Sequence, residues 1–112
     1  MKSNIHLTNV IRELKKQSAK EKVAIWKAVA RYLEHPVRRK REVNIAKINE
    51  CTKDKETVII PGKVLGNGQL DHNVTVAAFQ FSETANQKLK NKLTILELIK
   101  ENPKGKNVRI LG

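Results

Sequence analysis

Residues 74–81 constrain the fold strongly because they place apolar side chains on both faces of a predicted strand. A strand with one solvated face alternates apolar and polar residues, whereas a strand covered on both faces is apolar throughout. Residues 74–81 are therefore predicted to form a buried strand of a small sheet. The two faces carry, respectively, Val74, Val76 and Ala78, and Thr75, Ala77, Phe79 and Phe81.

Other β-type segments lie on either side of this strand in the sequence. Thr57–Ile60 is β-branched at every position, which favours an extended strand. Pro61-Gly62 interrupts the pattern, Lys63–Leu65 resumes it, and Gly66–Gly68 predicts a turn. Residues 107–111 are predicted to form the last strand.

The N-terminal third has helical periodicity. A first helix is predicted from the i, i+3, i+4, i+7 spacing of Leu7, Val10, Ile11 and Leu14. Ser18–Glu21 has the pattern of a capping box, which predicts a second helix running to about Glu34. Trp26 lies on the apolar stripe of that helix, so core packing is favoured over base stacking.

Shorter helices are predicted in the second part of the chain. One covers residues 42–50, one begins after Ser82 and runs through about Leu89, and one begins at a capping box at Thr94 and ends at Asn102-Pro103. The order of elements predicts an α+β or irregular α/β fold in which N-terminal helices precede a small sheet with short helices. The 112 residues fit a single domain, residues 1–112, with a basic helical part over 1–41 and a mixed α/β part over 42–112.

The charge balance indicates the kind of partner. Lys and Arg number 23 against 11 Asp and Glu, which gives a net charge of +12. Residues 1–41 hold 12 basic and 3 acidic residues, whereas residues 42–112 hold 11 and 8. The run Arg38–Arg41 has no interleaved acid, so its cations repel one another unless an anion binds them. This run predicts a phosphate-binding loop.

Several classes of protein are disfavoured. No segment approaches the ~20 apolar residues of a membrane span, and no apolar stretch of a secretory signal follows Met1. Cys51 is the only cysteine, which excludes an intramolecular disulfide and indicates a cytosolic chain. The histidines His6, His35 and His72 lack metal-site spacing, and no cofactor is expected.

No catalytic constellation is indicated. A triad of Ser82, His72 and Asp71 can be written, but an adjacent Asp and His in a turn region are ordinary loop composition. The glycines of residues 62–68 match neither a Walker loop nor a dinucleotide fingerprint. They permit either a close approach to a phosphate backbone or a tight turn.

The segment 57–68, followed by Val74–Ala78, resembles the signature of large-subunit ribosomal protein eL-eighteen, which is related to bacterial L-fifteen. Supporting matches are Leu33–Pro36, Glu42–Asn44, Phe81-Ser82 and Asn102-Pro103. The resemblance implies an irregular fold of β-hairpins and helices. It also implies a non-catalytic constituent of the cytoplasmic large ribosomal subunit, in contact with its RNA and neighbouring proteins, without a membrane or a small-molecule substrate. The sequence stops at Gly112, whereas the eukaryotic members are longer at the C-terminus, so its length is similar to that of the archaeal members.

The RNA contacts are expected in three groups. The first is the Arg38–Arg41 run with the following helix, the second is the glycine loop, and the third is the N-terminal set of cations. In this order the residues are Arg38, Arg39, Lys40, Arg41, Asn44 and Lys47; Gly62, Lys63, Gly66 and Gly68; and Lys2, Arg12, Lys15 and Lys16. Two alternatives remain: a free, non-specific RNA- or DNA-binding or chaperone-like protein, and a small RNA-processing enzyme.

Overall fold

The computed structural model describes residues 5–34 and 41–111, with Arg41 described by its backbone alone. The helices are α1 (Ile5–Glu21), α2 (Ala24–Glu34), α3 (Ile45–Cys51), α4 (Glu83–Lys88) and α5 (Ile95–Glu101). The strands are β1 (Arg41–Asn44), β2 (Glu56–Leu65), β3 (Val74–Phe81), β4 (Lys92–Thr94) and β5 (Val108–Ile110).

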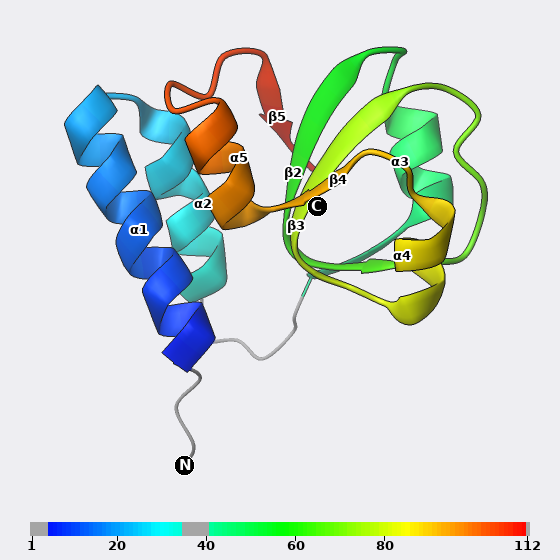
Figure 1. The fold of residues 1–112 in the computed structure, drawn as a ribbon, viewed down its shortest axis with the longest axis horizontal. Helices are drawn as coiled ribbons and strands as arrows, with labels where there is room; N and C mark the ends of the chain where they lie inside the picture. Colours follow the sequence, from blue (N-terminus) through cyan, green and yellow to red (C-terminus); the bar gives the residue numbers. More distant parts are fainter. Residues whose placement is uncertain (1–4, 35–40, 112) are drawn as a thin grey trace.

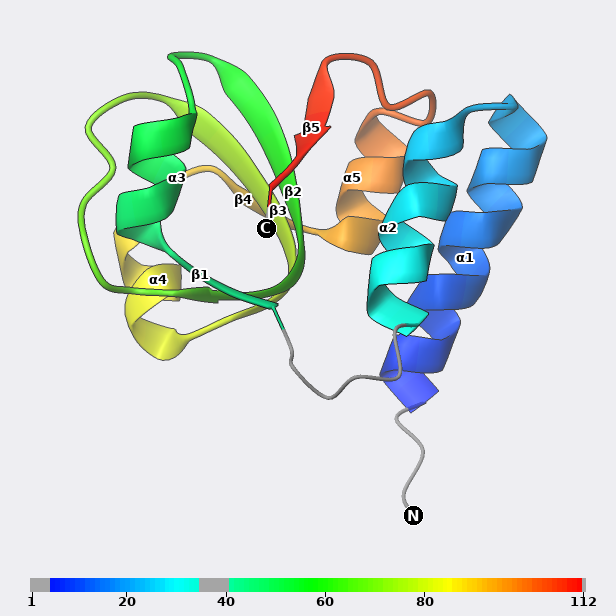
Figure 2. The same cartoon turned by 180° about the vertical axis from the view of Figure 1, so that it is seen from behind.

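The described residues form three layers, with helices on both faces of one sheet. Helices α1, α2 and α5 cover one face and α3 and α4 cover the other (Figures 1 and 2). Strand β3 lies between the two helical layers and packs against both. Val74, Val76 and Ala78 join the α3–α4 core, and Ala77 and Phe79 join the α1–α2–α5 core. The predicted burial of this strand is confirmed; Phe81 packs with the α3–α4 core instead of following Ala77.

All strand pairs of the described sheet are parallel. The strand order is β1-β2-β3-β4, and β5 pairs with β2 beside Thr57–Ile59, on a stretch that β1 does not reach. The mixed helix-and-sheet class is therefore confirmed, whereas the expected β-hairpins are wrong. The pairing is nonlocal, so local turn signals could not reveal it.

The connection from β2 to β3 is a crossover without a helix of its own. Parallel neighbours are usually joined by a dozen or more residues containing a helix, but here residues 66–73 return along α3 (Figure 1). Hydrogen bonds to α3, instead of the packing of an intervening helix, hold this loop in place. Ala46 N donates to Asn67 O at 2.9 Å, and Asp71 N donates to Asn49 Oδ1 at 3.0 Å.

The break between α1 and α2 does not lie at Ser18. Helix α1 continues to Glu21, and Lys22 takes a left-handed backbone with φ 57°. Val23 N donates to Ser18 O at 3.2 Å, which is the Schellman pattern of a helix C-terminus. The predicted N-terminal capping box is therefore wrong, and the Ser18 hydroxyl donates to Val23 O.

Two other boundaries differ from prediction. The expected helix over residues 42–50 begins with strand β1 and becomes helical only at Ile45. Strand β2 passes through Pro61, where its pairing with β3 shifts register between Ile60 and Lys63. A proline without an N–H is tolerated at such an irregularity.

The short-range helix signals are confirmed. Ser82 accepts a hydrogen bond from Ala85 N at the start of α4, and Thr94 and Glu97 form a capping box at the start of α5. Trp26 is fully buried, as predicted for a core residue. Its Nε1 donates to Pro103 O at 2.7 Å, which ties α2 to the loop between α5 and β5.

Candidate nucleic-acid interface

The first predicted group centres on the basic run. Arg38, Arg39 and Lys40 lie outside the described residues. Arg41 begins β1, and its backbone pairs in register with Gly62 of β2. The first and second predicted groups are thus joined at the backbone, because residues 41–44 and 62–65 form adjacent strands.

The side chain of Asn44 forms a hydrogen bond within the protein. Asn44 stands at the N-cap of α3 without a side-chain capping bond, and its Oδ1 accepts from Asn67 N at 3.3 Å. This hydrogen bond draws the glycine loop against the end of β1. Lys47 follows in the first turn of α3, where its side chain is exposed.

The glycines of the loop are required by close packing within the chain. A Cβ at Gly66 would meet Thr84 Cβ at 2.5 Å. At Gly68, φ is +106° and a Cβ would meet Ala46 N at 2.5 Å. Real Cβ atoms do not approach other atoms so closely, so the tight turn accounts for these glycines without a ligand.

Lys63 has a different setting from the glycines around it. Its side chain is half-buried in β2, and its register partners are Glu42 of β1 and Gln80 of β3. An acid therefore sits on the neighbouring strand. Lys63 is less accessible to a phosphate than an exposed lysine such as Lys47.

Lys88 is a loop-binding residue that sequence reasoning did not identify. Its Nζ donates to Gly66 O at 2.8 Å and to Gly68 O at 2.9 Å from the last turn of α4. These partners are 22 and 20 residues away, so no spacing rule could indicate the contact. The Lys88 ammonium group therefore bridges two carbonyl groups of the glycine loop.

The third predicted group is divided by the fold. Lys15 Nζ lies 2.6 Å from Glu34 Oε2, which joins α1 to α2. Arg12 and Lys16 are exposed on α1, and neither has an ion pair among the residues that the structure describes. Lys2 lies outside that part of the chain.

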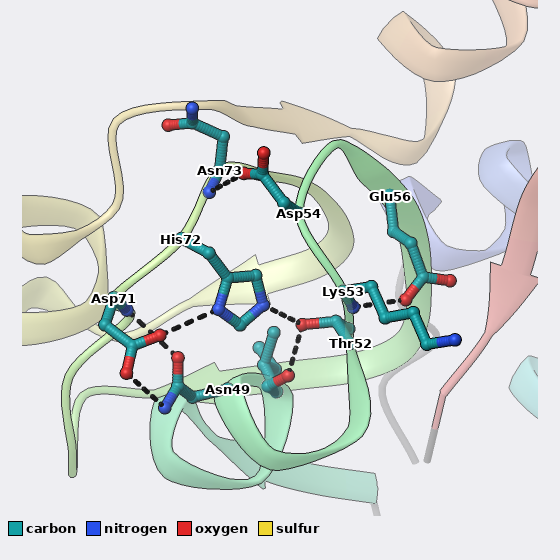
Figure 3. Close-up of polar contacts among 9 residues, drawn as sticks. Asn49, Thr52, Lys53, Asp54, Glu56, Asp71, His72 and Asn73 are labelled. Carbon is teal, nitrogen blue, oxygen red and sulfur yellow. Dashed lines mark hydrogen bonds and ion pairs between the residues drawn. The ribbon is translucent and has the colours of Figure 1, made fainter.

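Asp71 and His72 belong to a structural network around α3 (Figure 3). His72 Nδ1 lies 2.8 Å from Asp71 Oδ1, and His72 Nε2 lies 2.8 Å from Thr52 Oγ1. The Thr52 hydroxyl also donates to Ile48 O at 2.6 Å. Hydrogen bonds from His72, and next from Asn49, lower the pKa of the Asp71 carboxyl below its usual value of 3.8.

This network does not assemble the triad that could be written from the sequence. The hydrogen-bond partner of His72 Nε2 is Thr52, whereas the hydroxyl of Ser82 accepts from Ala85 N at 3.1 Å. In residues 5–34 and 41–111, no group of three His, Cys, Asp or Glu side chains could hold a metal ion. No helix among these residues is long and apolar enough to cross a membrane.

The structure and the charge define a small, strongly basic α/β protein whose described residues form neither a metal site nor the Ser82 triad. Comparison with protein families then identifies the group to which it belongs. The family described as ribosomal proteins 50S-L15, 50S-L18e and 60S L-twenty-seven-A matches residues 23–92. The chain belongs to this family of ribosomal proteins.

Individual relatives match almost the whole chain. Large ribosomal subunit protein eL18 of Methanothermobacter thermautotrophicus is 48% identical over 98% of this chain and 94% of its own length. The proteins of the same name from Methanoregula boonei and Methanococcus maripaludis are 47% and 48% identical. They cover 98% and 100% of this chain, and 94% and 97% of their own lengths. The resemblance to the eL-eighteen family is thus confirmed.

Proposed function

We propose that this protein is a non-catalytic structural constituent of the large ribosomal subunit in the cytoplasm, where it binds large-subunit ribosomal RNA and touches neighbouring ribosomal proteins. The observation that carries the proposal is the match to proteins named large ribosomal subunit protein eL18 across 98% of the chain. The net charge of +12 supports it, because a polyanion relieves the self-repulsion of so basic a domain.

The RNA contacts are assigned to the basic run, to the glycine loop and to further cations of the chain. The Arg38–Arg41 run leads into β1, and β1 pairs with the strand that ends in the glycine loop. Arginine can bind a phosphate through two parallel N–H groups, and lysine supplies a mobile point charge. The proposed contacts beyond the run are Asn44, Lys47, Gly62, Lys63, Gly66, Gly68, Lys2, Arg12, Lys15 and Lys16.

Membership of the subunit is tested by sedimentation of a cell extract through a sucrose gradient at high salt. Salt removes proteins that are held only by non-specific charge. We expect about one copy of the protein per large subunit after the salt wash. Recovery at the top of the gradient would instead support a free RNA- or DNA-binding protein of chaperone type.

The Arg38–Arg41 assignment is tested by replacing all four residues with Gln. The slope of log K against log salt for ribosomal RNA is expected to flatten by up to ~0.9 per lost phosphate contact on duplex. A control removes the same number of charges from Lys27, Arg31, Lys90 and Lys100, which are exposed elsewhere. Equal flattening in both variants would refute the assignment.

A further inference from the structure

Three lysine-rich segments lie near the amino ends of the parallel strands β2 and β5. They are the end of α1 with the α1–α2 turn (residues 20–23), the α3–β2 loop with the first residue of β2 (residues 52–56), and the α5–β5 loop (residues 102–107). All three lie at the same end of the sheet (Figures 1 and 2). We call this region the amino-end surface; its six lysines are Lys20, Lys22, Lys53, Lys55, Lys104 and Lys106.

Contacts inside the protein hold these loops together. Gln17 Nε2 and Trp26 Nε1 both donate to Pro103 O, and a Cβ at Gly105 would meet Ile25 Cγ2 at 2.5 Å. Strand β5 continues the α5–β5 loop and pairs with β2 at Thr57. The three segments are therefore linked to one another through the fold.

The lysines of this surface outnumber its acids, six to three. All six lysines are exposed, and none forms an ion pair in the part of the chain that the structure describes. The acids of the same segments are Glu21, Asp54 and Glu56. Two of them are engaged by other groups: Asp54 Oδ1 accepts from Asn73 N at 2.9 Å, and Glu56 Oε1 accepts from Lys53 N (Figure 3).

Two of the lysines occupy backbone conformations that glycine adopts more easily. Lys22 has φ 57° and Lys55 has φ 70°, both in the left-handed region. Lys22 also stands at the C-terminal position of α1 where glycine is the favoured residue. A side chain kept at a backbone cost is a reason to look for a function of that side chain.

From these observations we infer that the amino-end surface is a second RNA-binding surface, which contacts the phosphate backbone of duplex RNA through its lysines. It is separate from the proposed Arg38–Arg41 and glycine-loop contacts, because strand β2 runs from Glu56 at this surface to Leu65 at the glycine loop. The inference rests on the proposed function and extends it: one protein contacts RNA at both ends of its sheet.

The test uses Lys22→Gly and Lys55→Gly, which remove a charge and relieve the backbone together. Each variant is expected to have a higher Tm than the wild type. Each is also expected to bind a short generic RNA duplex more weakly, with a salt slope lower by up to ~0.9 per lost contact. Loss of binding therefore could not be assigned to unfolding.

Arg31→Gln is the matched control, because it removes one exposed positive charge from the last turn of α2, at the opposite end of that helix from the α1–α2 turn. It is expected to keep the wild-type slope. Unchanged slopes in both glycine variants would overturn the inference, and so would an equal loss in the control. The sedimentation test reads subunit membership alone, so failure of the proposed function would remain distinguishable from failure of this surface.

Discussion

Lys88 and Lys90 are exposed lysines two positions apart, but they differ in their hydrogen bonds. The Lys88 ammonium group donates to two carbonyl groups of the glycine loop, whereas Lys90 has no side-chain hydrogen bond among the described residues. The same contrast separates Lys15, which pairs with Glu34, from Lys16 beside it. At the residue scale, partners distant in the sequence decide which exposed lysines also stabilise the fold.

Lys88→Met is expected to lower the free energy of unfolding by about 1 kcal/mol, because it removes two charge-assisted but solvent-exposed hydrogen bonds. Urea denaturation measures the change. Lys90→Met removes the same charge and is expected to leave the stability within about 0.5 kcal/mol of the wild type. Equal losses in the two variants would mean that the Lys88 contacts contribute nothing.

The Asp71 carboxyl makes the free energy of unfolding depend on pH. Its folded-state pKa lies below the usual 3.8, so its stabilising contribution is present above that value and is lost as the pH falls through the folded pKa. Urea melts at a series of acid pH values should show a shallower loss of stability in Asp71→Asn than in the wild type. Glu50→Gln, which removes another exposed carboxyl, serves as the control. If Asp71→Asn loses stability as steeply as the wild type, the network does not stabilise the Asp71 carboxylate.

The crossover formed by residues 66–73 is the least regular element and depends on α3. It follows α3 through bonds to Asn44, Ala46 and Asn49, and its glycine end fits between α3 and α4. A short connection rich in glycine and asparagine is typical of a β-hairpin. Here the same composition lets the backbone pass close to two helices.

Gly68→Ala tests that packing. The new Cβ would meet backbone atoms of Ala46, which cannot move aside as a flexible side chain could. In addition, Gly68 has a φ of +106°, which residues with a side chain rarely adopt. We expect a loss of at least about 2 kcal/mol in the free energy of unfolding. Gln69→Ala, in the same loop and exposed, should change the stability little. A Gly68→Ala protein as stable as the wild type would exclude the close approach.

Local signals predicted the elements that local chemistry determines. The caps at Ser82 and Thr94 bond three residues ahead, and both were correct. The end of α1 was misassigned because a lysine stands where glycine usually marks a helix C-terminus. Parallel pairing and the short strand β4 depend on contacts across the chain, which no local pattern contains.

The candidate site was predictable in composition but not in arrangement. The cations were visible in the sequence, and the fold then divided them into exposed residues such as Arg12 and internally bonded ones such as Lys15. Asn44 was expected to face RNA, but its side-chain oxygen accepts from the glycine loop. The side-chain NH2 group of Asn44 remains a proposed RNA contact.

At the scale of the whole molecule, a charge of +12 on 112 residues makes stability dependent on counterions. An RNA that binds only the folded state should stabilise it by about 2.7 kcal/mol at one hundred times its Kd. We expect a rise in Tm of roughly 10 °C for a domain of this size. Thermal scans with ribosomal RNA measure the shift, and uncharged dextran is the control. The absence of any shift with RNA would contradict binding to the folded state.

Strand β5 completes one side of the central strand β2 by pairing with Thr57–Ile59, although these residues are about fifty positions earlier in the chain. During synthesis, residues 57–59 leave the translating ribosome long before residues 108–110 do. In the interval the middle of the sheet has an open edge, and an open edge can pair with another chain. The nascent protein thus has a period of vulnerability to aggregation that ends only when Ile110 has emerged.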